Sequence, residues 1–282
     1  MIVRQDLIVK FEGGVAEQHR LPAYQGSKSF YGITRSTLIT LNYLAEAKVR
    51  RREFSSNAFN LNLVAHQPGS FEAVYEIIAN MDAMTVAGTL GGGVAGNFLT
   101  DFIKSIFRRS VGQSADDEIE QLESEGKLNS GDLSALQDAI EPAIKEAHSV
   151  INHGAGQILI INGDRNIVNL NQATKEYVWN SHHDNEPNAK LFSIASYNAN
   201  SKSGRAFDYD LGKTLPFTIS EEADRETFST VLGSMTSYTF KRLGDNLPSG
   251  IALRYTSVVS NDGRVKKLII EKARKDILDL SS

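Results

Sequence analysis

Cysteine is absent from this chain, and histidine and tryptophan are scarce: the 282 residues include no cysteine, six histidines and one tryptophan. A chain without thiols has no disulfide framework, no thiolate nucleophile and no cysteine-type zinc site. The missing disulfides favour a reducing compartment, and we expect a cytoplasmic protein. The sequence therefore excludes small disulfide-stapled scaffolds and zinc-ribbon modules.

The few histidines are not spaced as metal ligands. His182 and His183 are adjacent, which places them on opposite faces of an extended segment. The five-residue step from His148 to His153 misses the i, i+4 geometry that directs two imidazoles to one metal. We therefore expect surface histidines, and we predict neither a metal site nor a cofactor.

Catalytic motifs are missing as well. The sequence has no G-x-S-x-G or Walker pattern, and no catalytic order of serine, histidine and aspartate can be argued. The N-terminus does not have the apolar core of a signal peptide, because Arg4, Asp6 and Lys10 interrupt it. An enzyme of an unrecognised type stays an alternative, but the sequence favours a binding and assembly protein.

A large net charge is also lacking, although the charges are unevenly distributed. The net charge is −4, yet residues 1–52 hold nine Lys or Arg against four Asp or Glu, and residues 241–275 hold nine against three. Residues 114–141 hold nine acidic residues against one basic residue. Such blocks are usually solvated faces; the alternatives are an anionic partner, or contact between acidic and basic regions of neighbouring subunits.

What the chain does contain is one long uncharged stretch, residues 83–100, with five glycines. Three of them lie four residues apart, so on a helix they share one face that a second helix can approach closely. The segment continues as the apolar face of an amphipathic helix. We predict that the protein is a homo-oligomer assembled through a glycine-zipper-like surface formed by Gly88, Gly92, Gly96, Phe102, Ile103 and Ile106.

Three structures stay open for the glycine stretch: a buried helix or helix-loop, a helix that associates with a membrane or a second copy, and a loop. Its 18 residues are borderline for crossing a bilayer, which takes about 20. Membrane contact through residues 83–109 is therefore a further expectation, which would place the protein at or in the inner membrane.

The N-terminal part predicts a β-α-β-β domain over residues 1–109. Alternation predicts a strand over 2–11, and three- and four-residue apolar steps predict a helix over 27–49 that ends at Arg50, Arg51 and Arg52. A hairpin follows over 60–78. Residues 110–154 are expected to be an acidic helical linker, in which Pro142 kinks or breaks a helix.

Residues 155–282 predict a second, β-rich domain. Strands are expected over 190–197, 204–209 and 214–219, followed by a helix over 220–243. A closing hairpin over 250–272 has Asp262-Gly263 in its turn, which is a strong hairpin signal. This pattern predicts a small barrel-like domain with an inserted helix.

The segment from residue 190 to 219 consists of a strand, an Asn-Ala turn, a glycine-containing second strand, and an acidic turn before a third strand. In this order of elements it resembles the start of a cold-shock-type OB barrel. In that family, aromatic side chains of the second strand stack on single-stranded bases, which implies a nucleic-acid-binding set of Tyr197, Lys202, Arg205 and Phe207. Here Arg205-Ala206 stands where the family is rich in aromatics. The sequence therefore favours a structural barrel, with Phe207 in its core.

The whole chain is predicted to be an α+β protein: an N-terminal β-α-β-β domain, a glycine-rich helical segment and a C-terminal barrel-like domain. This arrangement is similar to uncharacterised two-domain bacterial proteins of unknown function found in phage-defence neighbourhoods, which implies no particular residues. We expect a self-associating defence component, with a single-stranded nucleic-acid-binding module as the first alternative and an unrecognised enzyme as the second.

Overall fold

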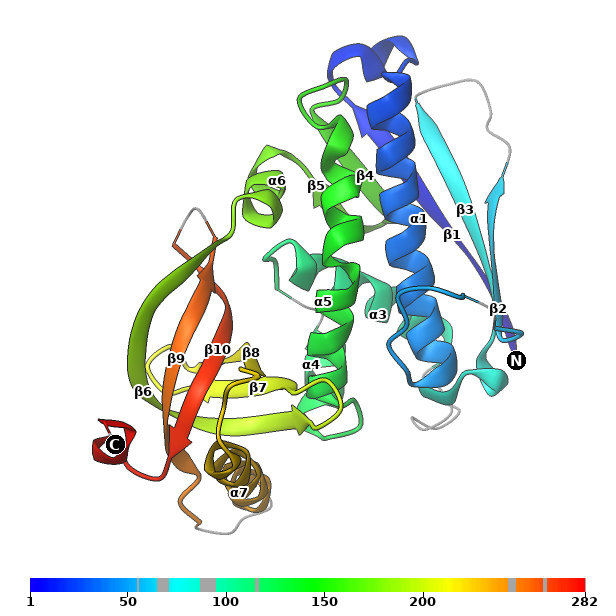
Figure 1. Cartoon of the computed structure of the whole chain (residues 1–282). Coiled ribbons are helices and arrows are strands. Elements are labelled where there is room, and N and C mark those ends of the chain that lie inside the picture. Colours follow the sequence, from blue (N-terminus) through cyan, green and yellow to red (C-terminus); the bar gives the residue numbers. More distant parts are fainter. Residues whose placement is uncertain are drawn as a thin grey trace. The chain divides into compact units, whose positions relative to one another are not determined.

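The computed structural model describes residues 1–54, 56–64, 71–86, 95–114, 117–242, 247–260 and 263–281. The chain forms two compact units (Figure 1). Unit 1 comprises residues 1–128 and 136–180, and unit 2 comprises residues 129–135 and 181–282. The predicted α+β class with two domains is confirmed.

Unit 1 combines an antiparallel sheet with helices. Its elements are β1 (Ile2–Glu12), α1 (Ala23–Glu46), β2 (Phe59–Val64), β3 (Glu72–Asn80), α3 (Ala95–Ser110), α4 (Asp117–Ser124), most of α5 (Ser130–Ala147), β4 (Gln157–Asn162), β5 (Arg165–Leu170) and α6 (Gln172–Trp179). The strand order is β2-β3-β1-β4-β5, and each neighbouring pair is antiparallel.

Period-two alternation in β1 determines which face of this sheet is buried. Leu7, Val9 and Phe11 are buried, whereas the residues between them are more exposed. Helix α1 covers the buried face, because the ring of Phe30 lies 5.0 Å from that of Phe11. The helices therefore pack on the side of the sheet that the alternation defines.

Helices α1 and α5 approach unusually closely at Gly32 of α1. A Cβ atom built on Gly32 would lie 2.3 Å from the backbone nitrogen of Ala147 and 2.4 Å from the carbonyl oxygen of Ala143. Ser29 and Ser36 are further small, buried residues of α1. A contact between helices at a glycine, which the sequence predicted for residues 83–100, is thus found at α1.

The predicted oligomerisation surface needs correction. Gly88 and Gly92 lie outside the described residues, and Gly96 belongs to α3. Phe102, Ile103 and Ile106 are fully buried within the chain. The ring of Phe102 stacks on Tyr43 of α1 at 5.9 Å. The apolar face of α3 is therefore part of the core of unit 1, where a second copy cannot reach it.

The predicted domain boundary at residue 154 also differs from the structure. Strand β4, which lies within the predicted second domain, pairs with β1, with Val9 opposite Ile160. Residues 155–180 consequently belong to unit 1. The expected linker is structured too: Ile119 and Leu122 of α4 are buried, and α5 runs through Pro142 without a break. Among the described residues, none of the helices meets the length and apolarity needed to cross a membrane.

Unit 2 is a closed ring of five strands with one helix inserted. Its elements are β6 (His182–Asn198), β7 (Ser203–Asp208), β8 (Lys213–Ile219), α7 (Arg225–Arg242), β9 (Gly250–Val259) and β10 (Val265–Arg274). The ring order is β10-β8-β7-β6-β9, with β8 and β10 parallel and the other pairs antiparallel. In an OB fold the third and fifth strands are parallel and a helix lies between the third and fourth strands. Unit 2 has this arrangement, with β8 and β10 as the parallel strands and α7 between β8 and β9.

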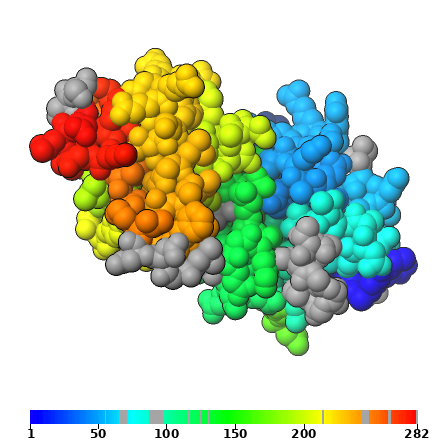
Figure 2. Space-filling view, turned by 90° about the horizontal axis from the view of Figure 1, so that it is seen from below, coloured from blue at the N-terminus to red at the C-terminus, as the bar shows by residue number. Residues whose placement is uncertain are grey.

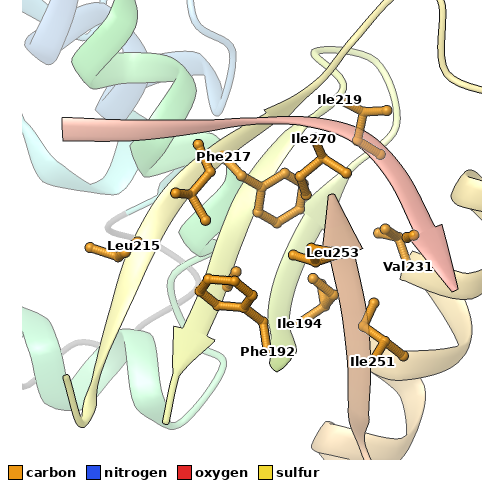
Figure 3. Close-up of a cluster of buried hydrophobic side chains, with 12 residues drawn as sticks. Phe192, Ile194, Leu215, Phe217, Ile219, Val231, Ile251, Leu253 and Ile270 are labelled. Atoms are coloured by element: carbon orange, nitrogen blue, oxygen red, sulfur yellow. The ribbon is translucent and has the colours of Figure 1, made fainter. Parts of the chain in front are cut away.

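A compact apolar core fills this ring. Phe192, Phe217, Leu253 and Ile270 point into its interior from four different strands, and Val231 of α7 joins them (Figure 3). Each of these side chains is almost completely buried. The interior is therefore occupied by protein, and any ligand of unit 2 has to bind on the outside of the ring.

Candidate nucleic-acid interface

Strand β7 separates inward from outward side chains. Ala206 belongs to the core of the ring, and because successive side chains alternate, Arg205 and Phe207 project to the outer face. Both are half-buried. OB folds bind oligonucleotides on the face of their second and third strands, which here are β7 and β8. The two residues thus lie on the face where such a ligand would bind.

The expectation that Phe207 lies in the barrel core is wrong. Its ring meets the ring of Tyr209 edge-on at 5.5 Å and an interplanar angle of 85°, and it lies 6.3 Å from the ring of Tyr238 in α7. We call Phe207, Tyr209 and Tyr238 the β7 aromatic cluster. Tyr209 keeps 45% of its surface exposed. The cluster therefore offers aromatic surface to solvent on the outer face.

A network of buried hydroxyl groups holds Tyr209 in place. The hydroxyl of Tyr209 shares a hydrogen bond with Ser193, whose Oγ is 2.8 Å from that of Ser249. Ser234 of α7 donates to the carbonyl oxygen of Ser249 at 2.6 Å and accepts from the backbone N–H of Ile194 at 3.0 Å. The ring of Tyr209 is consequently fixed from behind, so that little conformational entropy would be lost on stacking.

Arg205 is oriented by the neighbouring strand. Its Nε donates to the hydroxyl of Thr214 at 2.8 Å, and one terminal nitrogen donates to the carbonyl oxygen of Thr214 at 3.1 Å. Thr214 is the cross-strand partner of Phe207. The guanidinium is therefore held next to the β7 aromatic cluster, where it combines a positive charge with a planar group that can stack.

The other two predicted binding residues are placed differently. Tyr197 pairs with Gly204 in the register of β6 and β7, and its ring stacks on Phe217 at 6.3 Å and 6°. Burial raises the pKa of Tyr197. This residue packs against the core and cannot present a free ring to a base. Lys202 lies in the turn before β7, with φ at 52°, and its carbonyl oxygen accepts from Ile219.

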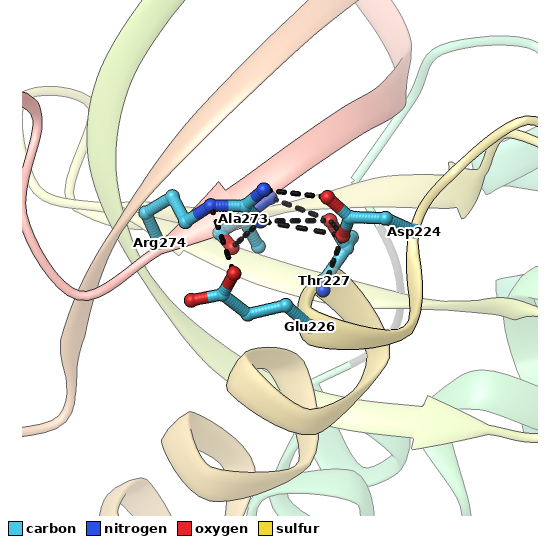
Figure 4. Close-up of polar contacts among 5 residues, drawn as sticks. All are labelled: Asp224, Glu226, Thr227, Ala273 and Arg274. Atoms are coloured by element: carbon cyan, nitrogen blue, oxygen red, sulfur yellow. Dashed lines mark hydrogen bonds and ion pairs between the residues drawn. The ribbon is translucent and has the colours of Figure 1, made fainter. Parts of the chain in front are cut away.

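Two ion-pair clusters stabilise the elements around this face. Arg274 of β10 binds Asp224, which also caps α7 by accepting from the backbone N–H of Thr227 at 2.8 Å (Figure 4). Hydrogen bonds from Arg274 and Thr227 hold the pKa of Asp224 far below its usual range. In the second cluster Asp208 binds Lys190 and accepts from the backbone N–H of Leu211 at 3.1 Å. That contact shapes the turn that carries Tyr209.

Thr214 and Tyr238 could not be assigned to the site from the sequence, and Tyr209, although an aromatic residue of the same segment, was not in the predicted binding set. Tyr209 follows Phe207 by two residues, which is the period of one strand face. Tyr238 lies seven residues after the buried Val231, a step that keeps to one face of a helix. Both spacings can be read from the sequence, but only the closed ring shows that Tyr209 and Tyr238 meet at Phe207.

A surface pocket of about 310 Å³ lies in unit 1, along one face of α6. It is lined by Asn152, His153, Gln172, Lys175, Glu176, Trp179 and Asn180. Several of its lining groups are already hydrogen-bonded: Asn152 donates to Gln172, Gln172 donates to Glu176, and Lys175 donates to the carbonyl oxygen of Ile151 at 2.7 Å. We therefore prefer the outer face of β7 as the candidate site.

One histidine contradicts the expectation of surface histidines. His148 is fully buried, with its ring nitrogens 2.7 Å from the carbonyl oxygen of Ile144 and 2.9 Å from the hydroxyl of Thr174. Burial is the main cause that lowers the pKa of His148 to about 4. His148 is thus a neutral residue of the core. Among the described residues there is also no cluster of three or more metal-binding side chains.

Comparison with known proteins follows the division into two units. A model described as a domain of unknown function (DUF7946) matches residues 7–179, and a model described as a family of unknown function (DUF7947) matches residues 186–274. Neither a curated protein nor a solved structure matches the chain. The gap between the two matched ranges, from residue 179 to residue 186, includes Ser181, where the longer segment of unit 2 begins.

Proposed function

We propose that this chain, which belongs to the DUF7946 family of unknown function, is a binding protein whose unit 2 binds single-stranded nucleic acid on the outer face of β7 and β8. The observation that carries the proposal is the position of Phe207. Phe207 lies outside the core of a five-stranded ring that has the strand order of an OB fold. It is beside Tyr209, Tyr238 and the oriented guanidinium of Arg205. Fold alone would not suffice, because one fold hosts many functions.

Stacking would supply most of the affinity. An exposed aromatic ring contributes about 1–3 kcal/mol per stacked base, whatever the base. Charge would contribute less, because residues 181–282 hold 14 Lys or Arg against 13 Asp or Glu. We therefore expect a ligand with unpaired bases, little sequence preference, and only a modest dependence of affinity on salt.

Fluorescence anisotropy with a labelled single strand of about 15 nucleotides tests the proposal, since one OB fold covers about 4–16 nucleotides. Phe207→Leu removes the ring but keeps apolar volume, and it should weaken binding by about 5- to 150-fold. Arg254→Gln is the matched control for Arg205→Gln, because Arg254 lies on β9 and pairs with Glu271 at 3.3 Å. Wild-type affinity in the Phe207 variant would refute the proposed site.

Self-association stays a separate proposal, carried by the spacing of Gly88, Gly92 and Gly96. A role in phage defence, membrane contact through residues 83–109, and an unrecognised enzymatic activity likewise stay predictions from the sequence. The solution mass of the full chain, with and without detergent, tests self-association directly.

A further inference from the structure

Helix α1 carries a row of alternating tyrosines and cations on its exposed face. Tyr24, Lys28, Tyr31 and Arg35 follow one another at steps of four, three and four residues, which keeps them on one side of the helix. Tyr24 is 69% exposed and Tyr31 is 56% exposed. We call these four residues the α1 ladder. Two large aromatic side chains so exposed on one helix indicate an interaction surface.

Each tyrosine of the α1 ladder is paired with the next cation. The Nζ atom of Lys28 lies 5.3 Å from the ring centroid of Tyr24, and Cζ of Arg35 lies 5.9 Å from that of Tyr31. Arg35 also donates to the hydroxyl of Tyr31 at 3.2 Å. These contacts order the side chains before a partner arrives, which reduces the entropy lost on binding.

Further positive charge lies at the C-terminal end of the α1 ladder. A second nitrogen of Arg35 donates to the carbonyl oxygen of Arg51 at 3.3 Å, which ties the segment after α1 to the ladder. Arg51 and Arg52 are exposed. In Figure 2 the mid-blue atoms on the molecular surface belong to this N-terminal part of the chain, α1 and the segment that follows it. Part of the charge is balanced, since Lys28 pairs with Glu146 at 3.1 Å. The surplus of basic over acidic residues in 1–52 remains, at nine to four.

The chemistry of this row points to a polyanion with exposed aromatic rings. Phosphate groups match the arginines, which bind them through paired N–H donors. A flat base can stack on a tyrosine ring, whereas the bases of a duplex are already stacked on one another. An amphipathic helix that binds a membrane would instead present Trp, Phe or Leu to the bilayer, and none of the exposed residues of α1 is of these types. An unpaired strand is thus the occupant that both kinds of side chain fit.

We propose that the α1 ladder is a second contact surface for single-stranded nucleic acid, located on unit 1. This inference rests on the proposed function in taking a single strand as the ligand, but it uses residues of the other unit. The chain then holds one strand at two places, and a longer strand gains affinity from the second contact through its effective concentration.

The experiment compares full-length variants for binding to short and long labelled single strands by anisotropy. Tyr24→Leu with Tyr31→Leu removes both rings and should weaken binding of the long strand at least tenfold, with a smaller effect on a short strand. Tyr31→Phe keeps the stacking surface and should stay within about twofold of the wild type. Arg4→Gln is the charge-matched control for Arg35→Gln, because the Arg4 side chain is 72% exposed and lies on β1.

Photocrosslinking with a thiouracil-containing strand, followed by peptide mapping, locates the contact. Crosslinks in the peptide with Tyr24 or Tyr31 support the inference. If the Phe207 variant loses affinity while the double tyrosine variant binds both strands normally, the ladder proposal is overturned and the proposed function stands. Loss in the tyrosine variant alone supports the ladder and rejects the β7 site. Binding to anionic phosphatidylserine vesicles without binding to any strand overturns both.

Discussion

Replacing Gly32 by alanine is the most direct test of how α1 and α5 pack. In an open helix this change normally stabilises by about 0.5–1 kcal/mol. Here the new Cβ would lie 2.3 Å from Ala147 N, 2.4 Å from Ala143 O and 2.9 Å from Ala147 Cα, all backbone atoms that cannot rotate away. Ordinary van der Waals contact would then require the helices to separate by about 1 Å. Overpacking of this kind costs about 1–3 kcal/mol. With the gain in helix propensity subtracted, we expect a net loss of about 1 kcal/mol.

Denaturant unfolding followed by tryptophan fluorescence measures this loss in unit 1, which contains the contact at Gly32. Trp179 is the only tryptophan of the chain, and its indole N–H donates to the carbonyl oxygen of Lys145 in α5. Gly233→Ala in α7 is the matched control, because a Cβ there meets nothing within 4 Å. It should stabilise unit 2 slightly and leave the fluorescence transition unchanged. A Gly32→Ala variant as stable as the wild type would show that the two helices are not in such close contact.

Three further predictions concern other parts of the chain. The pKa of His148 is lowered to about 4, below the unfolded value of about 6.5; the unfolded chain therefore binds the extra proton between these values. Stability should fall by up to about 3 kcal/mol as the pH drops through this window, and a His148→Gln variant measured by pH-dependent denaturation should lose that part of the dependence. The pKa of Asp224 is depressed in the folded chain, so its ionised form stabilises unit 2 at pH values above the usual aspartate pKa, and this stabilisation is lost as the pH falls through the pKa of the folded chain. Asp224→Asn should therefore lower the thermal midpoint of unit 2 at neutral pH. An unchanged midpoint would argue against the pairing with Arg274. Gly92→Leu should reduce the solution mass measured by light scattering if the glycine face holds copies together, and a mass that stays the same would exclude that face.

The sequence predicted many elements because their alternation is strong. The strand at residues 2–11, the hairpin of β2 and β3, and the strand-helix-hairpin order of unit 2 agree with the structure. Closure of the ring could not be read from the sequence, because the pairing of β8 with β10 joins strands about 50 residues apart. The outward position of Phe207 depends on that closure.

The domain boundary was misjudged for a similar reason. The apolar run of β4 has the same pattern whether it opens a new domain or extends an existing sheet. Only the pairing of Ile160 with Val9 decides between the two. Strand pairing across about 150 residues leaves no local signal, so the run alone could not assign β4 to unit 1.

Apolar periodicity alone predicts neither the contact of α1 with α5 nor the start of α1. Its close approach to α5 is made at Gly32, a residue that contributes nothing to an apolar pattern. The helix was expected to begin at residue 27, which left Tyr24 outside it. Pro22 is the N-cap residue directly before the observed start at Ala23, one residue from the first helical position, where proline is common. That signal would have placed both tyrosines on one helix.

The salt dependence of single-strand binding, measured by anisotropy for the wild type and for Phe207→Leu, tests whether unit 2 binds a single strand by stacking at Phe207. We expect the wild type to bind an unpaired strand, and we expect log K to fall with log salt at a shallow slope, of magnitude about 2 or less, since few phosphates are neutralised. Phe207→Leu should lower the affinity about 5- to 150-fold without changing this slope. Equal affinity of the two proteins, or the absence of binding to any single strand by the wild type, would contradict the claim.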